Sequence, residues 1–358
     1  MDKQILEKFI AFDVDSLVSA MKKIDSNTLG LVYVVDKNNV LVGCLTDGDA
    51  RRWIIRTGSI DGVVSDVMNH APKSILLSQR NMSEQIMRQY KIYSLAVVNE
   101  DCHIEDIIID PAILQSMTIE KRGSLSNTPV VIMAGGKGTR LYPYTKILPK
   151  PLIPIGEVPI IERILNRFSV YGIEDFWLSV NYKKEMIKSY FSELSPGYRL
   201  HYIEEDKPLG TAGSIRLLKE IPENPLIIAN CDCLINANYY DMIGFHKSSQ
   251  NAMTIVSALK NVVIPYGVLR SESEGVVSSV EEKPQLSYFI NTGMYILDPE
   301  YISWIPEGEF FHMTQLVEAL IQKGKKVGMY PISEDSFLDM GEFEEMKKME
   351  EKINSTTV

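Results

Sequence analysis

The sequence contains little cysteine. Its four cysteines, Cys44, Cys102, Cys231 and Cys233, are scattered over 358 residues. They are too few and too far apart for a disulfide framework, so we expect reduced thiols and a cytoplasmic protein. Cys231 and Cys233 could form half of a metal site. No second Cys/His pair stands at a suitable spacing, which favours small buried or strand-end residues over zinc ligands.

Long apolar runs are also missing. No stretch of about eighteen apolar residues occurs, so we expect no membrane-spanning helix and no membrane partner. The chain opens on Met1-Asp2-Lys3-Gln4 and continues as a charged amphipathic stretch. Because a signal peptide needs an apolar core, we expect no secretion.

Positive charge is the third shortage. The chain has 37 Lys and Arg against 47 Asp and Glu, a formal net charge of −10. This balance argues against nucleic acid as a partner. An anion-binding site in so acidic a chain must gather its few cations locally or recruit a metal ion. The length suffices for two or three domains.

A polar stretch, 121–128, predicts a linker between an N-terminal region, 1–120, and a C-terminal region, 129–358. In the N-terminal region the order helix, strand, turn, strand occurs twice. The first set is predicted at 16–24, 29–35 and 40–45, and the second at 82–90, 94–98 and 104–109. This is a structural duplication, which we divide at about 1–62 and 63–120.

In the C-terminal region, predicted strands and helices alternate. The strands are 130–133, 175–180, 198–204 and 226–229, and the helices are 159–171, 184–194 and 211–218. Such alternation predicts βαβ units, and therefore an α/β fold with a mainly parallel sheet covered by helices on both faces. The segment 253–280 is richer in strand patterns, which predicts some mixed pairing.

A glycine-rich loop follows the first of these strands. Glycines at 135, 136 and 138 allow backbone N–H groups to approach a phosphate chain, and Arg140 adds a fork of donors. Lys150, between two prolines, is a cation on a stiff backbone. Tight turns also need glycines, so the loop alone is a weak signal. It matches neither the Walker A loop nor the dinucleotide-binding fingerprint.

The pattern G-G-x-G-T-R-L-x-P-x-T, followed by P-K-P-L-x-P, resembles the signature of the nucleoside-diphosphate-sugar pyrophosphorylases, which are sugar-1-phosphate nucleotidyltransferases. Five further matches follow in order: P-L-G-T-A-G at 208–213, N-C-D at 230–232, E-E-K-P at 281–284, N-T-G at 291–293 and L-D-M-G at 338–341. The resemblance implies a Rossmann-like nucleotidyltransferase fold. The implied reaction is attack of a sugar-1-phosphate oxygen on the α-phosphorus of a nucleoside triphosphate, with release of pyrophosphate. The nucleophile is already an anion, so positioning and charge neutralisation are what the site must supply.

The resemblance also implies a role for individual residues. By the resemblance, the nucleotide-binding residues are Ala134, Gly135, Gly136, Gly138, Thr139, Pro208, Gly210 and Thr211. The implied sugar-binding residues are Gly213, Glu282, Asn291, Thr292 and Gly293. The implied catalytic residues are Arg140, Lys150, Asp232 and Lys283. Asp232 and Asp339 are the implied Mg²⁺ ligands. From the residues alone, each aspartate could instead be a helix cap or turn residue, and Lys283 part of an exposed charged turn.

The base is predicted from Glu205, three positions before Pro208, where thymidylyl relatives tend to carry Gln. A carboxylate accepts from two donors, which suits the N1–H and N2–H₂ groups of guanine and predicts GTP. Asp206 or Glu204 could serve if the register differs by one residue.

Among relatives, the chain resembles most the glucosamine-1-phosphate guanylyltransferases that prepare sugars for legionaminic-type acids. Mannose- or heptose-1-phosphate guanylyltransferases and glucose-1-phosphate uridylyl- or thymidylyltransferases remain open. A methylerythritol-phosphate cytidylyltransferase is disfavoured by the motifs at 208–213 and 281–284, and the absence of hexapeptide repeats disfavours a bifunctional acetyltransferase. A catalytically silent nucleotide sensor should have lost Arg140, Lys150, Asp232, Lys283 or Asp339, and all five are present.

The first N-terminal repeat contains Gly43-x-x-Thr46-x-x-Asp49, which resembles a CBS domain. In that family the threonine and aspartate hold a nucleotide ribose. The second repeat has Asp106, Ile109 and Ala112 at the corresponding positions, so at most one full site for a purine-nucleotide effector is expected per chain. The alternative is that the pair only dimerises. Either way, a homo-oligomer is expected.

Overall fold

The computed structural model describes residues 6–27, 30–110, 125–194 and 196–356. The chain divides into two compact units, Met1–Lys121 and Arg122–Val358. Residues 121–124 of the predicted linker, 121–128, lie outside the described residues, as does Ala112. None of the described helices has both the length and the apolar character to cross a membrane.

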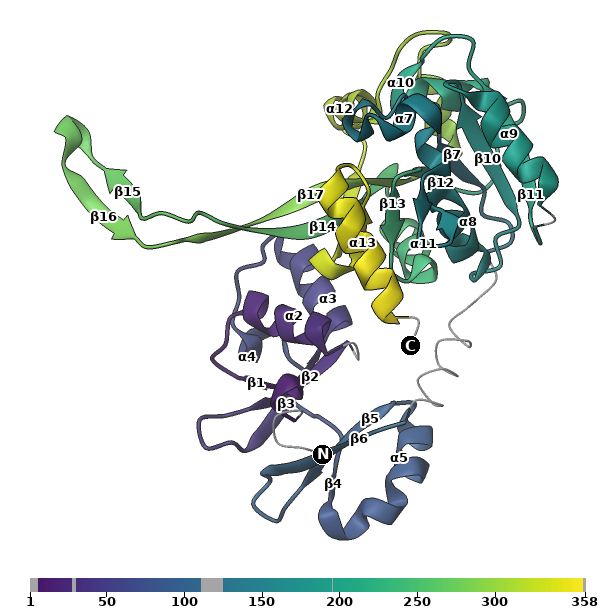
Figure 1. Cartoon of the computed structure of the whole chain (residues 1–358). Helices are drawn as coiled ribbons and strands as arrows, with labels where there is room; N and C mark the ends of the chain where they lie inside the picture. Colours follow the sequence, from purple (N-terminus) through teal and green to yellow (C-terminus); the bar gives the residue numbers. More distant parts are fainter. Residues whose placement is uncertain (1–5, 28–29, 111–124, 195, 357–358) are drawn as a thin grey trace. The chain divides into compact units, whose positions relative to one another are not determined.

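The first unit contains two small sheets with the same topology (Figure 1). One consists of β1 (Ile10–Phe12), β2 (Leu31–Val35) and β3 (Leu41–Thr46), and the other of β4 (Ser74–Leu76), β5 (Ser94–Val98) and β6 (Ile104–Ile109). In each, the first strand is parallel to the second and the second antiparallel to the third. The helices are η1 (Glu7–Phe9), α2 (Leu17–Ser26), α3 (Asp47–Thr57), α4 (Val64–Val67), η2 (Leu77–Met82) and α5 (Ser83–Tyr90). The repeat predicted from the sequence is present as two copies of one supersecondary unit.

The division between the repeats differs from the predicted one at residue 62. Val63 forms a bridge with Ser16, and Asn69 forms one with Cys44, so α4 belongs to the first repeat. Val64 is fully buried, which explains why this segment stays with the first sheet. The two repeats share a core: Tyr33 packs in one apolar cluster with Ala96 and Ile107, and its hydroxyl lies 3.0 Å from Ser94 Oγ.

The second unit is built on a seven-stranded sheet in the order β11-β10-β7-β12-β17-β14-β18. The strands are β7 (Val130–Met133), β10 (Asp175–Val180), β11 (Arg199–Glu204), β12 (Leu226–Asn230), β14 (Met253–Val263), β17 (Gln285–Leu297) and β18 (Val327–Ile332). All are parallel except β17, which runs against both of its neighbours. The predicted α/β class with a mixed, mainly parallel sheet is confirmed.

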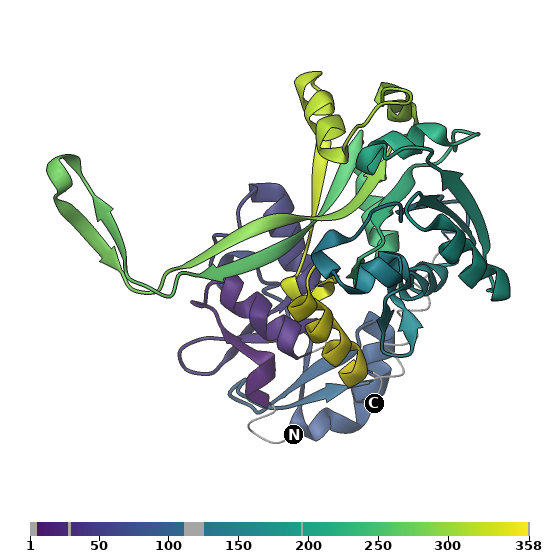
Figure 2. The same ribbon diagram turned by 45° about the horizontal axis from the view of Figure 1, so that its top comes forward.

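Helices cover both faces of this sheet (Figure 2). Successive strand residues point to opposite faces, so Val130 and Ile132 pack on one side and Val131 on the other. The first side is covered by α8 (Ile160–Ser169), α9 (Lys184–Glu193) and α11 (Tyr239–Ser248), and the second by α12 (Met313–Gln322) with α10 (Gly210–Gly213) and η5 (Ser214–Leu217). The predicted helix at 211–218 is therefore wrong as one element, since it consists of these last two short pieces. The chain ends in α13 (Phe343–Thr356).

The order of the strands reverses between β7 and β12. From β7 the chain moves outward through β10 to β11, and then returns to place β12 on the other side of β7. In open α/β sheets a crevice opens at such a switch point, outside the carboxyl ends of the strands. The glycine-rich loop follows β7 and Asp232 follows β12, so both predicted motifs begin at this crevice.

Beyond the sheet, β14 and β17 continue as a long two-stranded ladder that projects from the body of this unit (Figure 1). It is extended by β15 (Val268–Ser271) and β16 (Val277–Glu281), which among the described strands pair only with each other. We call residues 260–288 the arm.

Candidate active site

Two adjoining pockets occupy the crevice. The larger, about 380 Å³, is lined by the glycine-rich loop, the segment at 205–211 and residues from Asn230 to Asp232. The smaller, about 200 Å³, is lined by residues 291–293, by Asp339 and by the end of β12. Arg140, Asn230 and Asp232 line both pockets and form a common wall. The site can therefore hold two ligands that meet at this wall.

The glycine-rich loop forms the floor of the larger pocket. Gly138 adopts a left-handed conformation with φ +62°, and a Cβ there would lie 2.9 Å from Thr145 and 3.0 Å from Lys150. The Thr145 hydroxyl donates a 2.9 Å hydrogen bond to the Gly138 carbonyl and fixes the turn. Gly135, Gly136, Gly138, Thr139 and Arg140 all line this pocket as predicted. Ala134 does not line the pocket: it is fully buried at the end of β7, where its N–H donates to the Ser179 carbonyl.

Lys150 and Asp232 form a buried ion pair. The Lys150 ammonium donates to Asp232 Oδ2, and the side chains are 10% and 13% exposed. Burial lowers the pKa of Lys150, but the charge of Asp232 and the hydrogen bond outweigh it, so the pKa is raised overall. Lys150 is therefore a fixed cation that holds Asp232 in place at the common wall.

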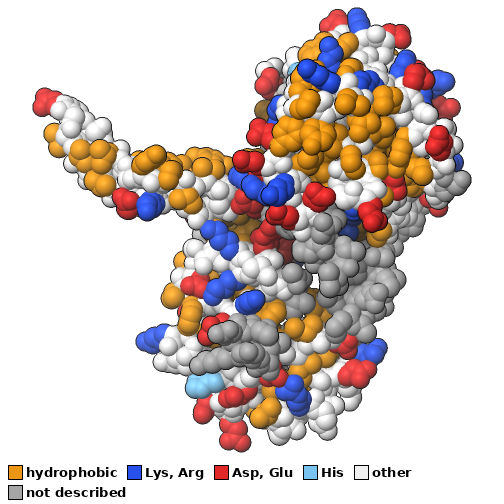
Figure 3. Space-filling view, in the orientation of Figure 1, with side chains coloured by type: hydrophobic (Ala, Val, Ile, Leu, Met, Phe, Trp, Pro, Cys, Tyr) orange, Lys and Arg blue, Asp and Glu red, His pale blue; other side chains and the backbone are white. Residues whose placement is uncertain are grey.

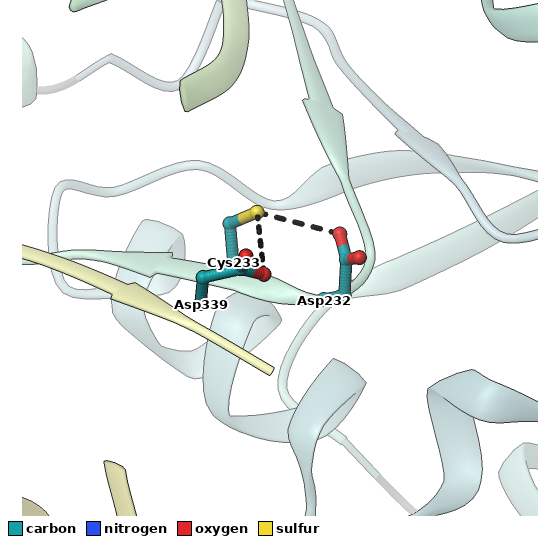
Figure 4. A group of neighbouring side chains, drawn as sticks. All are labelled: Asp232, Cys233 and Asp339. Carbon is teal, nitrogen blue, oxygen red and sulfur yellow. Dashed lines mark hydrogen bonds between the residues drawn. The ribbon is translucent and has the colours of Figure 1, made fainter. Parts of the chain in front are cut away.

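Asp339 lies beside Asp232 because β19 (Phe337–Asp339) pairs with β13 (Cys233–Ile235), which follows Asp232 directly. Burial, with the negative charge of Asp232, raises the pKa of Asp339. The Cys233 thiol lies 3.3 Å from Asp232 Oδ1 and 3.9 Å from Asp339 Oδ1 (Figure 4). Burial and both aspartates raise the pKa of this thiol well above its usual range.

Asp232, Cys233 and Asp339 are close enough together to hold a metal ion. One ligand atom from each of Asp232, Cys233 and Asp339 lies within 4.8 Å of the others. Two neighbouring carboxylates whose charges disfavour each other fit a hard divalent cation such as Mg²⁺, which takes one or two carboxylates together with phosphate oxygens. A neutral, buried thiol is not a ligand that Mg²⁺ prefers.

Glu205 lies on the opposite wall of the larger pocket and is 6% exposed. Its Oε1 accepts a 2.5 Å hydrogen bond from Ser179 Oγ, and its Oε2 accepts one of 2.9 Å from the Leu209 N–H. Each carboxylate oxygen keeps a second acceptor position. Glu204 is exposed and bound by Lys184 and Lys188, outside the pocket, so among the three candidate carboxylates Glu205 is the one at the site.

The segment at 208–213 is held by a part of the chain that the sequence did not single out. The N–H groups of Ala212 and Gly213 donate to the Phe311 carbonyl, and Thr211 Oγ1 accepts from the Met313 N–H at 3.0 Å. Pro208, Gly210 and Thr211 line the larger pocket, joined there by Phe310 and His312. Gly213 is buried, and a Cβ on it would lie 2.8 Å from the Glu309 carbonyl oxygen. Gly213 therefore permits close packing of the backbone and does not line either pocket.

A β-bulge shapes the smaller pocket. The register between β14 and β17 shifts so that Val256 pairs with Met294 but Ser257 pairs with Asn291, which leaves Thr292 and Gly293 as extra residues. Thr292 is buried, and its hydroxyl donates to the Val256 carbonyl at 2.7 Å. Asn291, Thr292 and Gly293 all line the pocket as predicted, and the Thr292 hydroxyl also holds the bulge in place. Bulges often re-aim side chains next to active sites.

Glu282 and Lys283 are not brought to these pockets. Both are exposed and lie on the arm, beyond the Gln285–Val263 pair that ends the β14–β17 ladder. Eight residues of extended chain separate Lys283 from Asn291, a span of about 26 Å. The sequence motif is present, but within one chain it is remote from the other site residues.

In the first unit, Thr46 and Asp49 form the N-terminal cap of α3. The Thr46 hydroxyl lies 2.6 Å from Asp49 Oδ2, and the Asp49 N–H donates to Thr46 Oγ1. Arg52 lies 2.5 Å from the other Asp49 oxygen. In the second repeat, Asp106 pairs with Arg80 at 2.7 Å. Asp106 lies on β6 and corresponds to Gly43, and the second repeat has Ile109 where Thr46 caps α3 in the first.

The fold and the site define the class of this protein. Residues 129–356 match the family model described as nucleotidyl transferase, and the chain belongs to that family. Its relatives act on sugar-1-phosphates according to their names, and the guanylyltransferases are prominent among them.

Three comparisons place the chain among particular relatives. It is 29% identical over 232 residues to UTP–glucose-1-phosphate uridylyltransferase of Synechocystis, which covers 59% of each chain. It is 33% identical over 184 residues to mannose-1-phosphate guanyltransferase of Debaryomyces hansenii, covering 49% of this chain and 51% of the relative. With D-glycero-alpha-D-manno-heptose 1-phosphate guanylyltransferase of Campylobacter jejuni the identity is 32% over 214 residues, 59% of this chain and 93% of the relative.

Among solved structures, HddC from Yersinia pseudotuberculosis is similar with a TM-score of 0.50 and 28% identity, over 63% of this chain and 99% of that one. The chain spans 59% and 51% of the lengths of the first two curated relatives.

Proposed function

We propose that this protein transfers the nucleotidyl group of a nucleoside triphosphate to a sugar-1-phosphate and releases pyrophosphate. The observation that carries this proposal is the pair of pockets that meet at Arg140, Asn230 and Asp232. A triphosphate on the glycine-rich loop and a sugar phosphate at the bulge would approach each other at that wall. Membership of the family supports the same reaction class.

The residues of the chain would act by position and charge. Arg140 lines both pockets and can donate to phosphate oxygens of both substrates. The Lys150 ammonium fixes the carboxylate of Asp232 at the wall. We propose that Asp232 and Asp339 hold Mg²⁺, which when bound would supply positive charge for the phosphate oxygens. The attacking phosphate needs no general base, because it is already ionised.

We further propose GTP as the nucleotide and glucosamine-1-phosphate as the sugar. Glu205 supports guanine, because its carboxylate faces the pocket on the side of the 208–211 segment and can accept hydrogen bonds. The guanylyltransferases of mannose and heptose phosphates among the relatives support the base. The names of these two relatives make mannose-1-phosphate and heptose-1-phosphate the alternative sugar substrates. The name of the Synechocystis relative makes UTP with glucose-1-phosphate the alternative substrate pair.

A matrix of five nucleoside triphosphates against glucosamine-, mannose-, heptose- and glucose-1-phosphate, with Mg²⁺ and a pyrophosphate readout, tests these proposals separately. Turnover that is highest with GTP and glucosamine-1-phosphate is the expected result. Activity in another cell of the matrix would correct the substrates and keep the reaction class. No turnover with any combination would refute the reaction class.

A further inference from the structure

Strand pairing places the Cys233 thiol among the carboxylates that are proposed to hold Mg²⁺. In the short ladder between β13 and β19, Cys233 lies directly opposite Asp339. Residues directly opposite each other in an antiparallel pair carry their side chains on the same face. Asp232 precedes Cys233, and one ligand atom from each of the three residues lies within 4.8 Å of the others. The backbone therefore builds the thiol into this group.

Each aspartate has one oxygen beside the thiol and the other oxygen beside a different neighbour. Cys233 Sγ lies 3.3 Å from Asp232 Oδ1 and 3.9 Å from Asp339 Oδ1 (Figure 4). Asp232 Oδ2 accepts from the Lys150 ammonium. Asp339 Oδ2 lies against Gly341, where a Cβ would be 2.8 Å from it. The sulfur and the two Oδ1 atoms are thus left facing one another.

The sulfur–oxygen separations suit a tetrahedral metal ion that is bound through sulfur. A zinc ion has metal–sulfur bonds of about 2.3 Å and metal–oxygen bonds of about 2.0–2.2 Å, so tetrahedral angles place sulfur and oxygen about 3.5–3.7 Å apart. The two distances in the protein, 3.3 and 3.9 Å, lie on either side of that range. Small shifts of the side chains would therefore be enough to bind such an ion.

The sulfur atom distinguishes this group from the other acidic side chains of the protein. Figure 3 shows Asp and Glu side chains scattered over the surface among Lys and Arg side chains, and exposed acidic groups of this kind are common without an ion. Hard cations such as Mg²⁺ prefer oxygen ligands, whereas thiophilic cations such as Zn²⁺ and Cd²⁺ prefer thiolate sulfur. The third ligand therefore favours a different class of cation from the one that the two carboxylates alone favour.

The group opens on a pocket, which gives an ion a way in and leaves it a free coordination position. Asp232, Cys233 and Asp339 all line the smaller pocket. Three protein ligands with one open position are typical of accessible zinc sites, whereas structural zinc sites are closed by four protein ligands. Cys231, on the other side of Asp232, lines the larger pocket and does not belong to the group. The two neighbouring cysteines therefore differ in their access to a shared ion.

We propose that Asp232, Cys233 and Asp339 form a binding site for a thiophilic divalent cation such as Zn²⁺ or Cd²⁺. On binding, a metal–sulfur bond replaces the S–H bond of Cys233, and the proton leaves to solvent. The site shares both aspartates with the proposed Mg²⁺ site, so the two kinds of cation compete for them.

The competition has a consequence for catalysis, and this part rests on the proposed function. A tetrahedral ion with three protein ligands keeps one open position, whereas an octahedral Mg²⁺ with two protein ligands keeps four. The thiophilic ion cannot hold as many phosphate oxygens as Mg²⁺ does. Zn²⁺ or Cd²⁺ therefore inhibits the transfer reaction, and Cys233 makes the protein sensitive to these ions.

Cadmium binding is measured without substrate or turnover. A cadmium–thiolate bond gives a charge-transfer absorption band in the ultraviolet, which should appear when the metal-free full-length protein is titrated with Cd²⁺. Cys233→Ser should weaken Cd²⁺ binding at this site by at least about 100-fold, since loss of even an outer partner of a metal ligand costs about 10–100-fold. Cys231→Ser is the matched control, because it removes a buried thiol beside Asp232 that lies outside the group.

Excess Mg²⁺ should reduce the wild-type band, which separates this site from binding at Cys44 or Cys102 in the first unit. Circular dichroism reports whether each variant is folded, and Cys233→Ala repeats the test should the serine hydroxyl disturb the buried position. The cation site is refuted if Cys233→Ser keeps the full band or if Cys231→Ser loses as much of it. A wild-type band that excess Mg²⁺ leaves unchanged would refute the sharing of the aspartates.

Inhibition of the proposed reaction is the second measurement. Zn²⁺ should inhibit the wild type and Cys231→Ser at lower concentrations than Cys233→Ser, with each protein compared with its own uninhibited rate. Equal sensitivity of all three proteins would overturn inhibition through Cys233. A wild type without any turnover would refute the proposed reaction and not the cation site, because the absorption band reports on that site separately.

Discussion

Burial and the negative charge of Asp232 raise the pKa of Asp339. The folded protein therefore disfavours the ionised form of this carboxyl group. Below the pKa of the unfolded state, the carboxyl is protonated in both states and costs no stability. As the pH rises through the higher folded-state pKa, the folded protein must ionise a group that it prefers neutral, so stability is lost. A bound cation would remove this cost.

We therefore expect Asp339→Asn to behave in opposite ways with and without Mg²⁺. In metal-free buffer at pH 7–8 the variant should melt above the wild type, and the difference should vanish as the pH falls. Mg²⁺ at 100 times its Kd should stabilise the wild type by about 2.7 kcal/mol and leave the variant unchanged. Thermal unfolding against pH, with and without Mg²⁺, gives both results, and an equal Mg²⁺ response in the two proteins would refute the metal site. Asp339 is a better choice than Asp232, whose replacement would also leave the buried Lys150 unpaired.

Glu205 allows a test of base selection with little structural disturbance. Glu205→Gln can accept from the Leu209 N–H with its oxygen and donate to Ser179 with its amide, so both present contacts survive. We expect kcat/KM for GTP to fall about tenfold or more, roughly the loss of one good hydrogen bond, while that for UTP does not fall. Glu204→Gln is the control, because Glu204 lies one residue away outside the pocket and is bound by Lys184 and Lys188. Equal losses with both triphosphates would contradict a role in reading guanine.

At single positions, the sequence could indicate the glycines and carboxylates, because their spacing follows from local geometry at strand ends. It could not indicate Phe310 and His312, which line the pocket from about one hundred residues away; His312 bonds Thr211, and Phe310 packs on His312. The burial of Thr292 could not be predicted from the sequence either, because the register shift on β17 decides which way its side chain points.

Among the elements, the bulge on β17 is the one that shapes a binding surface. Its Thr292 hydroxyl bonds the Val256 carbonyl and accepts from the Met294 N–H. Thr292→Val keeps the side-chain shape and removes both bonds, which should destabilise the protein by about 1–3 kcal/mol. Because Asn291 and Gly293 would lose their placement, we expect KM for the sugar phosphate to rise several-fold and KM for the triphosphate to change little.

Thr254→Val is the matched control for that variant. Thr254 is a buried threonine of β14 whose hydroxyl is bonded to His246 and Asn251, away from both pockets. It should lose similar stability in thermal unfolding and keep both KM values. If the two variants change the kinetics alike, the effect is one of general stability and the bulge has no special part in sugar binding.

The elements of the sheet were largely predictable, because a buried parallel strand gives a short apolar run. The segment at 211–218 was not, since the N–H groups of Ala212 and Gly213 donate to the Phe311 carbonyl and break what the sequence pattern predicts as one helix. The arm was also missed. Its residues have ordinary strand patterns, and nothing in them tells a ribbon that leaves the sheet from one that stays in it.

For the whole molecule, the sequence indicated the duplication and the second unit, but placed the seam between the repeats too early. The polar pair Asp61-Gly62 looks like a boundary, whereas the buried Val64 keeps α4 with the first sheet. Local polarity marks a turn, and only packing decides to which repeat the next helix belongs.

We propose that the first unit binds a purine nucleotide at Thr46 and Asp49. With AMP, ADP, GMP or GDP, the full chain should show a ligand-dependent rise in Tm. The rise should persist in Asp339→Asn, which alters only the second unit, and be lost in Asp49→Asn. If the rise in Tm is lost in Asp339→Asn instead, the nucleotide binds in the transferase pockets. If no nucleotide raises the Tm, the proposed nucleotide site is refuted, and Thr46 and Asp49 only cap α3.

The common wall of Arg140, Asn230 and Asp232 has a thermodynamic consequence. Two ligands that share one wall cannot bind independently, since each alters the charge and position of groups that the other uses. Linkage requires the effect to be mutual: whatever factor the triphosphate imposes on the affinity for the sugar phosphate, the sugar phosphate imposes on the affinity for the triphosphate. Measured in both directions at equilibrium, that single coupling free energy would express in one number how closely the two pockets are joined.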